Sequence, residues 1–308
     1  MTAASGENTT ENRSWTGQTM GSRLGHFGFF LLMRIFGRRF AGGILVTVSL
    51  FYYLFRPKVR KDSLPYLSRR FPHSGKTALT WHGWRLVHSF SEVLLDRLYL
   101  RLRGGQGFQV EFPDTQRIRD ALETGKGVLL LSAHMGNWEV AGRFFGRLGA
   151  PVSVVMFENE RTEIRELYEK LSREGTLPYQ PIFSNDPIDT ILRVHRALAQ
   201  NHIVVMHGDR SLTNGGIMVP FLGFVACFPD APYRIAAATG AAVVPTFCVR
   251  QGISRYLVKA LPHFTVENTG EGIEAAGRSF VAAVEECVQR YPYQWYNFYD
   301  FWNNGESQ

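Results

Sequence analysis

The sequence predicts an α/β domain with a central mixed, largely parallel sheet flanked by helices, preceded by an N-terminal membrane-associated helical segment. The chain has 308 residues and is 45% hydrophobic, which is enough for a substantial core. Short apolar runs alternate with amphipathic stretches from residue 108 onward, the pattern of strands alternating with helices. A long apolar segment flanked by Arg and Lys comes before this region.

The N-terminal region divides into two parts. Residues 1–23 are polar and predict a disordered tail. Residues 24–61 predict a membrane anchor, although their longest uncharged run, 41–55, has 15 residues where a spanning helix needs about 20. A helix lying in the membrane interface therefore fits better than a clean span, and a buried helical hairpin of the main domain is the alternative.

Charge is concentrated at the N-terminus. The formal net charge is +7, and residues 1–80 hold 12 Lys and Arg against three acidic residues. A nucleic-acid-binding domain would spread basic residues over its folded part, whereas here they bracket an apolar segment. The distribution predicts an anionic membrane surface as partner and no nucleic acid.

Residues 62–302 predict one α/β domain without internal repeats. Its strands are expected at 108–112, 127–132, 152–156, 202–206 and 242–249. Its helices are expected at 77–102, 115–124, 138–148, 158–173, 187–200, 231–239 and 274–291.

Titratable side chains follow two of the predicted strands. His134 comes just after the strand at 127–132, and His207 and Asp209 come just after the strand at 202–206. Chemistry in such sheets gathers at the carboxyl ends of strands, and a histidine is the natural base near neutral pH. We expect Asn137 to cap the next helix, which would let Glu139 fold back and fix the histidine tautomer.

Other interpretations of these residues stay open. The helix dipole alone favours Glu139 in a first turn, and His134 could be a hydrogen-bonded turn residue. The sequence has no GxSxG elbow, no P-loop and no GxGxxG, and its three cysteines lack metal-ligand spacing. We therefore expect no metal and no cofactor, and a substrate that brings its own hydroxyl or amine nucleophile.

Two motifs resemble those of a known family. Residues 133–139, Ala-His-Met-Gly-Asn-Trp-Glu, look like the His-four residues-acidic motif of the glycerolipid acyltransferases, in the version of the lipid A secondary acyltransferases. Residues 215–223 are similar to that group's Gly-x-x-Val-Pro-Phe-Phe-Gly segment, and residues 238–247 resemble the stretch that follows it. The resemblance covers residues 24–302.

The resemblance implies a membrane acyltransferase on the cytoplasmic face of the bacterial inner membrane. It implies that the catalytic residues are His134 and Glu139, with His134 taking the proton of an acceptor hydroxyl that attacks an acyl thioester. It implies acyl carrier protein or acyl-CoA as donor, and a lipid or glycolipid as acceptor. The substrate-binding residues that it suggests are Asn137, Asp209, Arg210, Gly215, Gly216, Pro220, Phe221 and Gly223.

Within this set, Arg210 and the backbone of 215–216 are candidate oxyanion donors, and the apolar segment 219–224 could be core, an acyl-chain wall or a membrane-facing lip. The aromatic run 291–299 is expected to pack against the last helix or to lie at a membrane interface. A lipid-ester hydrolase and a noncatalytic lipid-binding protein remain alternatives.

Overall fold

The computed structural model describes residues 23–157, 177–184, 186–210 and 215–302. Nearly all of the predicted tail and the predicted helix at 158–173 lie outside the described residues.

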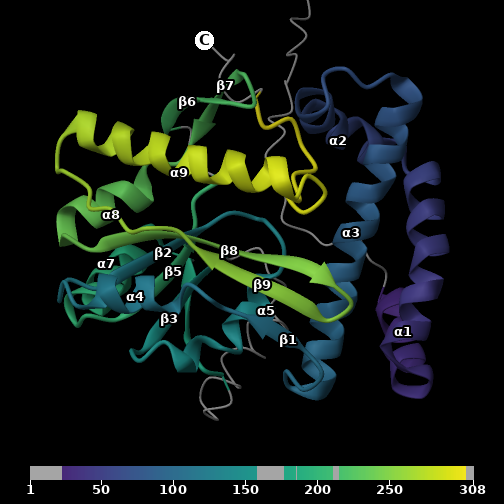
Figure 1. The fold of residues 1–308 in the computed structure, drawn as a ribbon, viewed down its shortest axis with the longest axis horizontal. Helices are drawn as coiled ribbons and strands as arrows, with labels where there is room; N and C mark the ends of the chain where they lie inside the picture. Colours follow the sequence, from purple (N-terminus) through teal and green to yellow (C-terminus); the bar gives the residue numbers. More distant parts are fainter. Residues whose placement is uncertain (1–22, 158–176, 185, 211–214, 303–308) are drawn as a thin grey trace, which may run out of the picture.

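The described residues contain a seven-stranded sheet in the order β1-β9-β8-β2-β5-β3-β4 (Figure 1). Every neighbouring pair is parallel except β8 and β9, which form an antiparallel hairpin. The strands are β1 Gln109–Glu111, β2 Val128–Ser132, β3 Val152–Phe157, β4 Gln180–Ser184, β5 Ile203–His207, β8 Ala242–Gly252 and β9 Arg255–Ala260. The predicted mixed, largely parallel sheet is confirmed.

Helices cover both faces of this sheet. The helices of the domain are α3 Lys76–Arg103, α4 Thr115–Leu122, α5 Trp138–Gly142, α7 Pro187–Ala199, α8 Ala231–Thr239 and α9 Gly270–Arg290. In Figure 1, α8 and α9 lie above the sheet and α4 and α5 below it. Alternate residues of β2 enter the two cores, Leu129 and Leu131 on one face and Val128 and Leu130 on the other. Burial on both faces explains the continuous apolar sequence of this strand.

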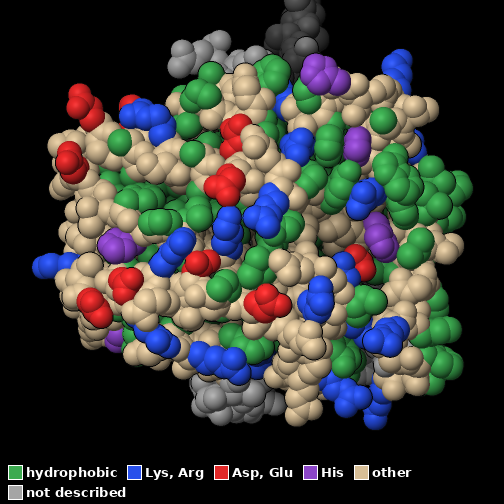
Figure 2. All heavy atoms as spheres, in the orientation of Figure 1, with side chains coloured by type: hydrophobic (Ala, Val, Ile, Leu, Met, Phe, Trp, Pro, Cys, Tyr) green, Lys and Arg blue, Asp and Glu red, His purple; other side chains and the backbone are tan. Residues whose placement is uncertain are grey.

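Two long helices precede the domain. The first, α1 Arg23–Phe55, is kinked at Gly37, whose φ is 79°, and α2 is Pro57–Arg70. The segment Arg34–Phe55 is the one stretch among the described residues that is long and apolar enough to cross a membrane. One face of α1 packs along α3, while the other exposes hydrophobic side chains on the right of Figure 2. The exposed set is Leu31, Ile35, Phe36, Phe40, Val46, Val48, Leu50, Phe51, Leu54 and Phe55.

A two-stranded hairpin, which was not predicted from the sequence, stands apart from the main sheet. It consists of β6 Ile217–Phe221 and β7 Phe224–Phe228, joined by the two-residue turn at Leu222 and Gly223. Both turn residues have positive φ, 53° and 82°, as the type I′ turn of a tight hairpin requires.

The predicted helix at 138–148 is shorter than expected. In the structure α5 ends at Gly142, and a separate 3₁₀ turn spans Phe145–Arg147. Asn137 occupies the N-cap position of α5, but its side chain makes no capping hydrogen bond, which corrects the expected cap. The side-chain amide instead lies 3.5 Å from the Tyr256 hydroxyl, in a fully buried position.

Candidate active site

The site lies where β2 and β5 end side by side. Ser132 pairs in register with His207, so the residues that follow both strands emerge at one edge of the sheet. His134 follows β2 and Asp209 follows β5, and the rings of His134 and His207 stack with centroids 4.5 Å apart. The structure thus brings together three titratable residues from segments about 75 positions apart.

A tight turn after β2 orients His134. Gly136 has a φ of +62°, and a Cβ at this position would lie 1.8 Å from the Cys248 carbonyl oxygen. Only glycine fits so close to the neighbouring strand. The Asn137 amide donates to the same Cys248 carbonyl at 2.9 Å, which fixes the turn against β8.

The aromatic segment near the C-terminus closes the turn from the other side. The Gly136 amide donates to the Gln294 carbonyl at 2.8 Å, and the Tyr296 amide donates to the His134 carbonyl at 3.0 Å. The Gln294 side chain, in turn, bonds the backbone N–H and C=O of Arg250, each at 2.7 Å. The turn that carries His134 is therefore held by backbone hydrogen bonds on both sides.

Asp209 is the partner of the His134 ring. Its Oδ1 lies 2.8 Å from His134 Nδ1, and its Oδ2 accepts from the His134 amide and from Trp295 Nε1, each at 2.9 Å. Burial alone would raise the pKa of Asp209, but the charge and hydrogen bond of His134, together with Arg210, hold it well below its usual range. The carboxylate therefore stays ionised and accepts all three hydrogen bonds.

The tautomer of His134 follows from this partner. A carboxylate accepts only, so Nδ1 carries the proton and, in the neutral ring, Nε2 is the basic nitrogen. Burial, and next the positive charge of Arg210, lower the pKa of His134 below 6.5, against the opposing effect of Asp209. The side chain keeps 22% of its surface exposed. His134 is thus neutral near pH 7, and part of its side chain reaches the surface.

His207 is a second histidine of the site. Burial and the neighbouring His134 lower the pKa of His207 to about 3, so its ring is neutral at physiological pH. Its Nε2 is buried and makes no hydrogen bond within the described part of the chain. Its ring lies between those of His134 and Trp138.

Glu139 is buried in the first turn of α5, and its Oε1 lies 3.2 Å from Arg97 Nε of α3. From the sequence, we predicted that Glu139 fixes the His134 tautomer, whereas in the structure Nδ1 bonds to Asp209. The catalytic role of Glu139 stays a prediction. Its pairing with Arg97 fixes α5 to α3 beside the base.

The other predicted site residues follow β5 or belong to the hairpin β6–β7. Arg210 follows Asp209, and its Nη2 donates to the Tyr296 carbonyl at 2.6 Å. Gly215 and Gly216 lead into β6, where a Cβ at Gly216 would lie 2.3 Å from the Phe228 carbonyl oxygen. Glycine at 216 is therefore required by hairpin packing, and an oxyanion role for 215–216 stays a prediction.

The remaining three predicted site residues lie in the hairpin β6–β7. Pro220 points outward and is exposed, Phe221 is fully buried, and Gly223 forms the turn. The Phe221 ring packs edge-on against Trp295 at 5.2 Å, so the hairpin reaches the site through this tryptophan.

Sequence reasoning did not assign Trp295 and Arg97 to the site. Trp295 belongs to the noted aromatic run at 291–299, and an aromatic residue with an N–H donor inside a buried run was the available signal. Arg97 lies in a predicted amphipathic helix, where Arg is common, so no signal in the sequence indicated that it belongs to the site. Across the described residues, no group of three or more His, Cys, Asp or Glu side chains could hold a metal ion.

The sequence profile of the bacterial lipid A biosynthesis acyltransferases matches residues 93–304, which include the whole sheet and the site. The chain belongs to this family. It is 24% identical over 204 residues to a phosphatidylinositol mannoside acyltransferase of Mycolicibacterium smegmatis, covering 65% of this chain and 64% of that protein. It is 29% identical over 137 residues to a protein of the same name from Mycobacterium tuberculosis, covering 43% and 42% of the two chains. The matches thus span less than two thirds of these relatives' length.

Proposed function

We propose that this member of the lipid A acyltransferase family transfers a fatty acyl group from a thioester donor to a hydroxyl of a lipid or glycolipid acceptor. The observation that carries the proposal is the His134–Asp209 pair, held at the ends of β2 and β5 within the family match. It supplies a neutral histidine base with a fixed tautomer and a partly exposed side chain.

The first step uses His134 Nε2 as general base. Nε2 takes the proton of the acceptor hydroxyl as its oxygen attacks the thioester carbonyl carbon, which gives a tetrahedral oxyanion. The imidazolium keeps its Nδ1–H on Asp209, and this buried carboxylate stabilises the new positive charge.

The second step returns the proton. The oxyanion collapses, the carbon–sulfur bond breaks, and the leaving thiolate takes the proton from Nε2. The products are an acylated acceptor and a free thiol, with His134 neutral again. No protein nucleophile and no redox change are needed.

The oxyanion needs hydrogen-bond donors. Arg210 and the amides of Gly215 and Gly216 are our candidates, because Arg210 directly follows the Asp209 that holds the base. The charge of Arg210 acts on His134 strongly enough to lower the pKa of that ring, which supports a position close to the reacting atoms.

The donor and acceptor are proposed by class. An acyl carrier protein or acyl-CoA supplies the thioester at the cytoplasmic face of the inner membrane. The acceptor carries a sugar or lipid hydroxyl, and the names of the mycobacterial relatives favour a mannosylated phosphatidylinositol as the first compound to test. The exposed apolar face of α1 supports a membrane location.

The test is acyl transfer by the purified protein. Radiolabelled acyl thioester is incubated with and without candidate acceptors, and the acylated lipid and the released thiol are both measured. We expect thiol release to depend on the acceptor. Thiol release at the same rate without acceptor would identify a hydrolase, and no release with any donor would favour a noncatalytic lipid-binding protein.

His134→Ala is the decisive variant. It should lower the turnover number by about 10²- to 10⁴-fold because the general base is lost. Thermal unfolding is measured alongside, because the change also removes the ring partner of the buried Asp209 carboxylate. Lys126→Ala, a surface change between α4 and β2, serves as the matched control. More than about a tenth of the normal rate in His134→Ala would contradict the assignment.

A further inference from the structure

The outer face of the hairpin β6–β7 is apolar. Residues 217–228 contain no charged side chain. The inner-face residues Ile217, Val219 and Phe221 are buried, as the alternation of a half-buried strand requires. On the outer face, Pro220 pairs with Val225 and Met218 with Cys227, and all four side chains are apolar.

Several of these apolar side chains are well exposed. Met218 is 52% exposed and Val225 is 56% exposed, while Phe224, beside the turn, is 52% exposed. Figure 2 shows hydrophobic side chains at the upper edge of the molecule, where Figure 1 places β6 and β7. A water-facing strand would alternate to polar residues here, so this face is built for an apolar or interfacial partner.

Arginines of α2 adjoin the hairpin tip. The Arg69 guanidinium lies 4.7 Å from the centre of the Phe224 ring and 4.4 Å from that of Trp302. Its Nη1 donates to the Pro65 carbonyl at 3.0 Å, and its Nε is buried without a hydrogen-bond partner among the described residues. Arg70 donates to the Gln289 carbonyl at 2.6 Å.

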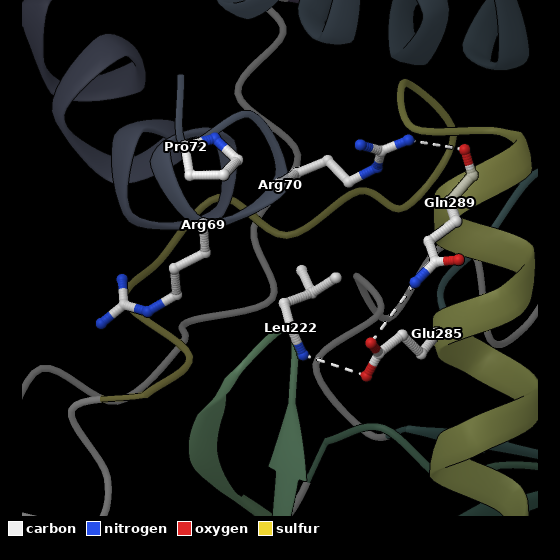
Figure 3. Close-up of a pocket in the computed structure, with 6 residues that line it drawn as sticks. All are labelled: Arg69, Arg70, Pro72, Leu222, Glu285 and Gln289. Carbon is white, nitrogen blue, oxygen red and sulfur yellow. Dashed lines mark hydrogen bonds between the residues drawn. The ribbon is translucent and has the colours of Figure 1, made fainter. Parts of the chain in front are cut away.

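Between the arginines and the tip lies an open pocket of about 390 Å³ (Figure 3). Its lining is Arg69, Arg70, Pro72, Leu222, Glu285 and Gln289. Glu285 is the one acidic side chain in this lining, and both of its oxygens are engaged, by the Leu222 amide at 3.0 Å and the Gln289 side chain at 3.4 Å. The pocket therefore carries a net positive charge beside an exposed apolar tip.

We propose that the hairpin β6–β7 inserts its outer face into an anionic bilayer and that Arg69 and Arg70 bind lipid phosphate groups at the same surface. Apolar side chains flanked by arginines match the boundary between acyl chains and anionic headgroups. The proposal rests on the membrane location proposed above, and it adds a second contact distinct from α1.

This contact has a direct path to the site. Phe221, on the inner face of the hairpin, packs against Trp295, which donates to Asp209. A bilayer that holds the hairpin therefore holds the element against which the catalytic pair is packed, and it brings the site to the membrane surface where a lipid acceptor resides.

The test uses the full chain and local probes. In a Cys227→Ala background, which removes the partly exposed native thiol of the hairpin, an environment-sensitive fluorophore is placed at Val225→Cys, and at Ile188→Cys as control, since Ile188 of α7 is 71% exposed. With phosphatidylglycerol-containing vesicles, the label at 225 should shift to the blue and become protected from an aqueous quencher. The label at 188 should do neither. Unchanged exposure of the label at 225 on protein that has sedimented with vesicles would show that α1 alone holds it and would overturn the proposal.

The charges are tested by vesicle sedimentation. Arg69→Gln and Arg70→Gln should each raise the anionic lipid concentration needed for half-binding about fivefold, because a basic residue near such a surface contributes about that factor. Arg278→Gln, an exposed change on α9, should have no effect. Equal binding of all three variants would contradict lipid headgroup binding. So would a result in which free inorganic phosphate, added as competitor, abolishes the difference between the variants.

The outcome is independent of the chemistry. His134→Ala should show the same fluorescence shift and sedimentation as the unaltered chain. Membrane contact of the label at 225 without acyl transfer would refute the proposed function but not the membrane contact of the hairpin. Acyl transfer by protein whose label at 225 stays exposed to water would refute the membrane contact but not the proposed function.

Discussion

Asp209 shows how one buried carboxylate determines what a neighbouring histidine can do. It accepts from the His134 ring, the His134 amide and the Trp295 ring, so both oxygens are used. The His134 backbone amide holds the Asp209 carboxylate in a fixed position relative to the His134 ring. The ring tautomer is therefore set by geometry that leaves Asp209 little freedom to rotate.

Replacing Asp209 by Asn tests this arrangement. The single oxygen of Asn would accept from the His134 amide and Trp295, which turns its NH₂ group toward Nδ1. His134 would then carry its proton on Nε2 and could not act as a base, so we expect turnover to fall by about 10⁴-fold. Steady-state kinetics measures the loss, and the thermal unfolding midpoint monitors the fold. Trp295→Phe, which removes one donor but keeps the ring pair, should lose much less.

A pH-dependent stability follows from His207. Its pKa is lowered from 6.5 to about 3, so between these values the unfolded chain binds a proton at this residue that the folded chain does not. Stability should therefore fall as pH drops from 6.5 toward 3. In His207→Phe, the slope of unfolding free energy against pH should decrease by about one proton over this window. Urea unfolding at several pH values measures the slope, and an unchanged slope would contradict a buried neutral His207.

At this scale, local patterns were predictable and distant partners were not. Sequence reasoning located His134 and Glu139 because they share one turn after a predicted strand. It paired them with each other because they are close in sequence. The structure pairs His134 with Asp209 and Glu139 with Arg97, and such partners depend on which strands and helices become neighbours.

At the scale of elements, the buried parallel strands were the most predictable. The strands expected at 127–132, 202–206 and 242–249 are continuous apolar runs and correspond to β2, β5 and β8. The hairpin β6–β7 was missed because its outer face is apolar too, so its period of two is hidden in the sequence. β4 and β9 were not predicted.

The contact between α1 and α3 contains a buried ion pair. Asp96 of α3 is fully buried and accepts from Arg38 Nε at 2.5 Å and from the Tyr256 hydroxyl at 2.6 Å. Arg250 Nε lies 3.4 Å from the same carboxylate. An arginine that interrupts the apolar segment in sequence is thus an internal contact of the fold.

Removing this arginine should destabilise the protein. We expect Arg38→Met to lower the unfolding free energy by about 3–5 kcal/mol, because it leaves a buried carboxylate short of a partner. Denaturant unfolding in detergent measures the change. Arg39→Met is the matched control, since Arg39 is the exposed neighbour on the same helix. Equal stability of the two variants would show that the ion pair contributes nothing.

At the scale of the whole molecule, the two faces of α1 have different surroundings, so deleting the helix would change both at once. One face packs on α3 and the other presents apolar side chains to the surroundings. The sequence predicted an apolar basic segment at 24–61 but could not show that one face of its helix packs against α3. The exposed face must therefore be altered without disturbing the packed one.

The double variant Phe51→Ser with Phe55→Ser alters only the exposed face of α1, since these side chains are 62% and 66% exposed. We expect the double variant to move from the membrane pellet toward the supernatant, because two large apolar groups no longer enter the bilayer. Fractionation of expressing cells measures the shift. Ile191→Ser with Leu192→Ser, on α7, should leave the distribution unchanged. Identical pelleting of both double variants would remove α1 as the anchor.

The position of Trp295 also bears on the order in which the protein acquires activity during its synthesis. Residues 294–296 bond the turn that carries His134, yet they are synthesised after both His134 and Asp209. Until then Asp209 lacks one of its donors and the turn lacks its second support. A nascent chain can thus form much of the sheet before the turn that carries His134 has all of its hydrogen bonds. If His134 is the base that we propose, acyl transfer can begin only after residues 294–296 have left the ribosome.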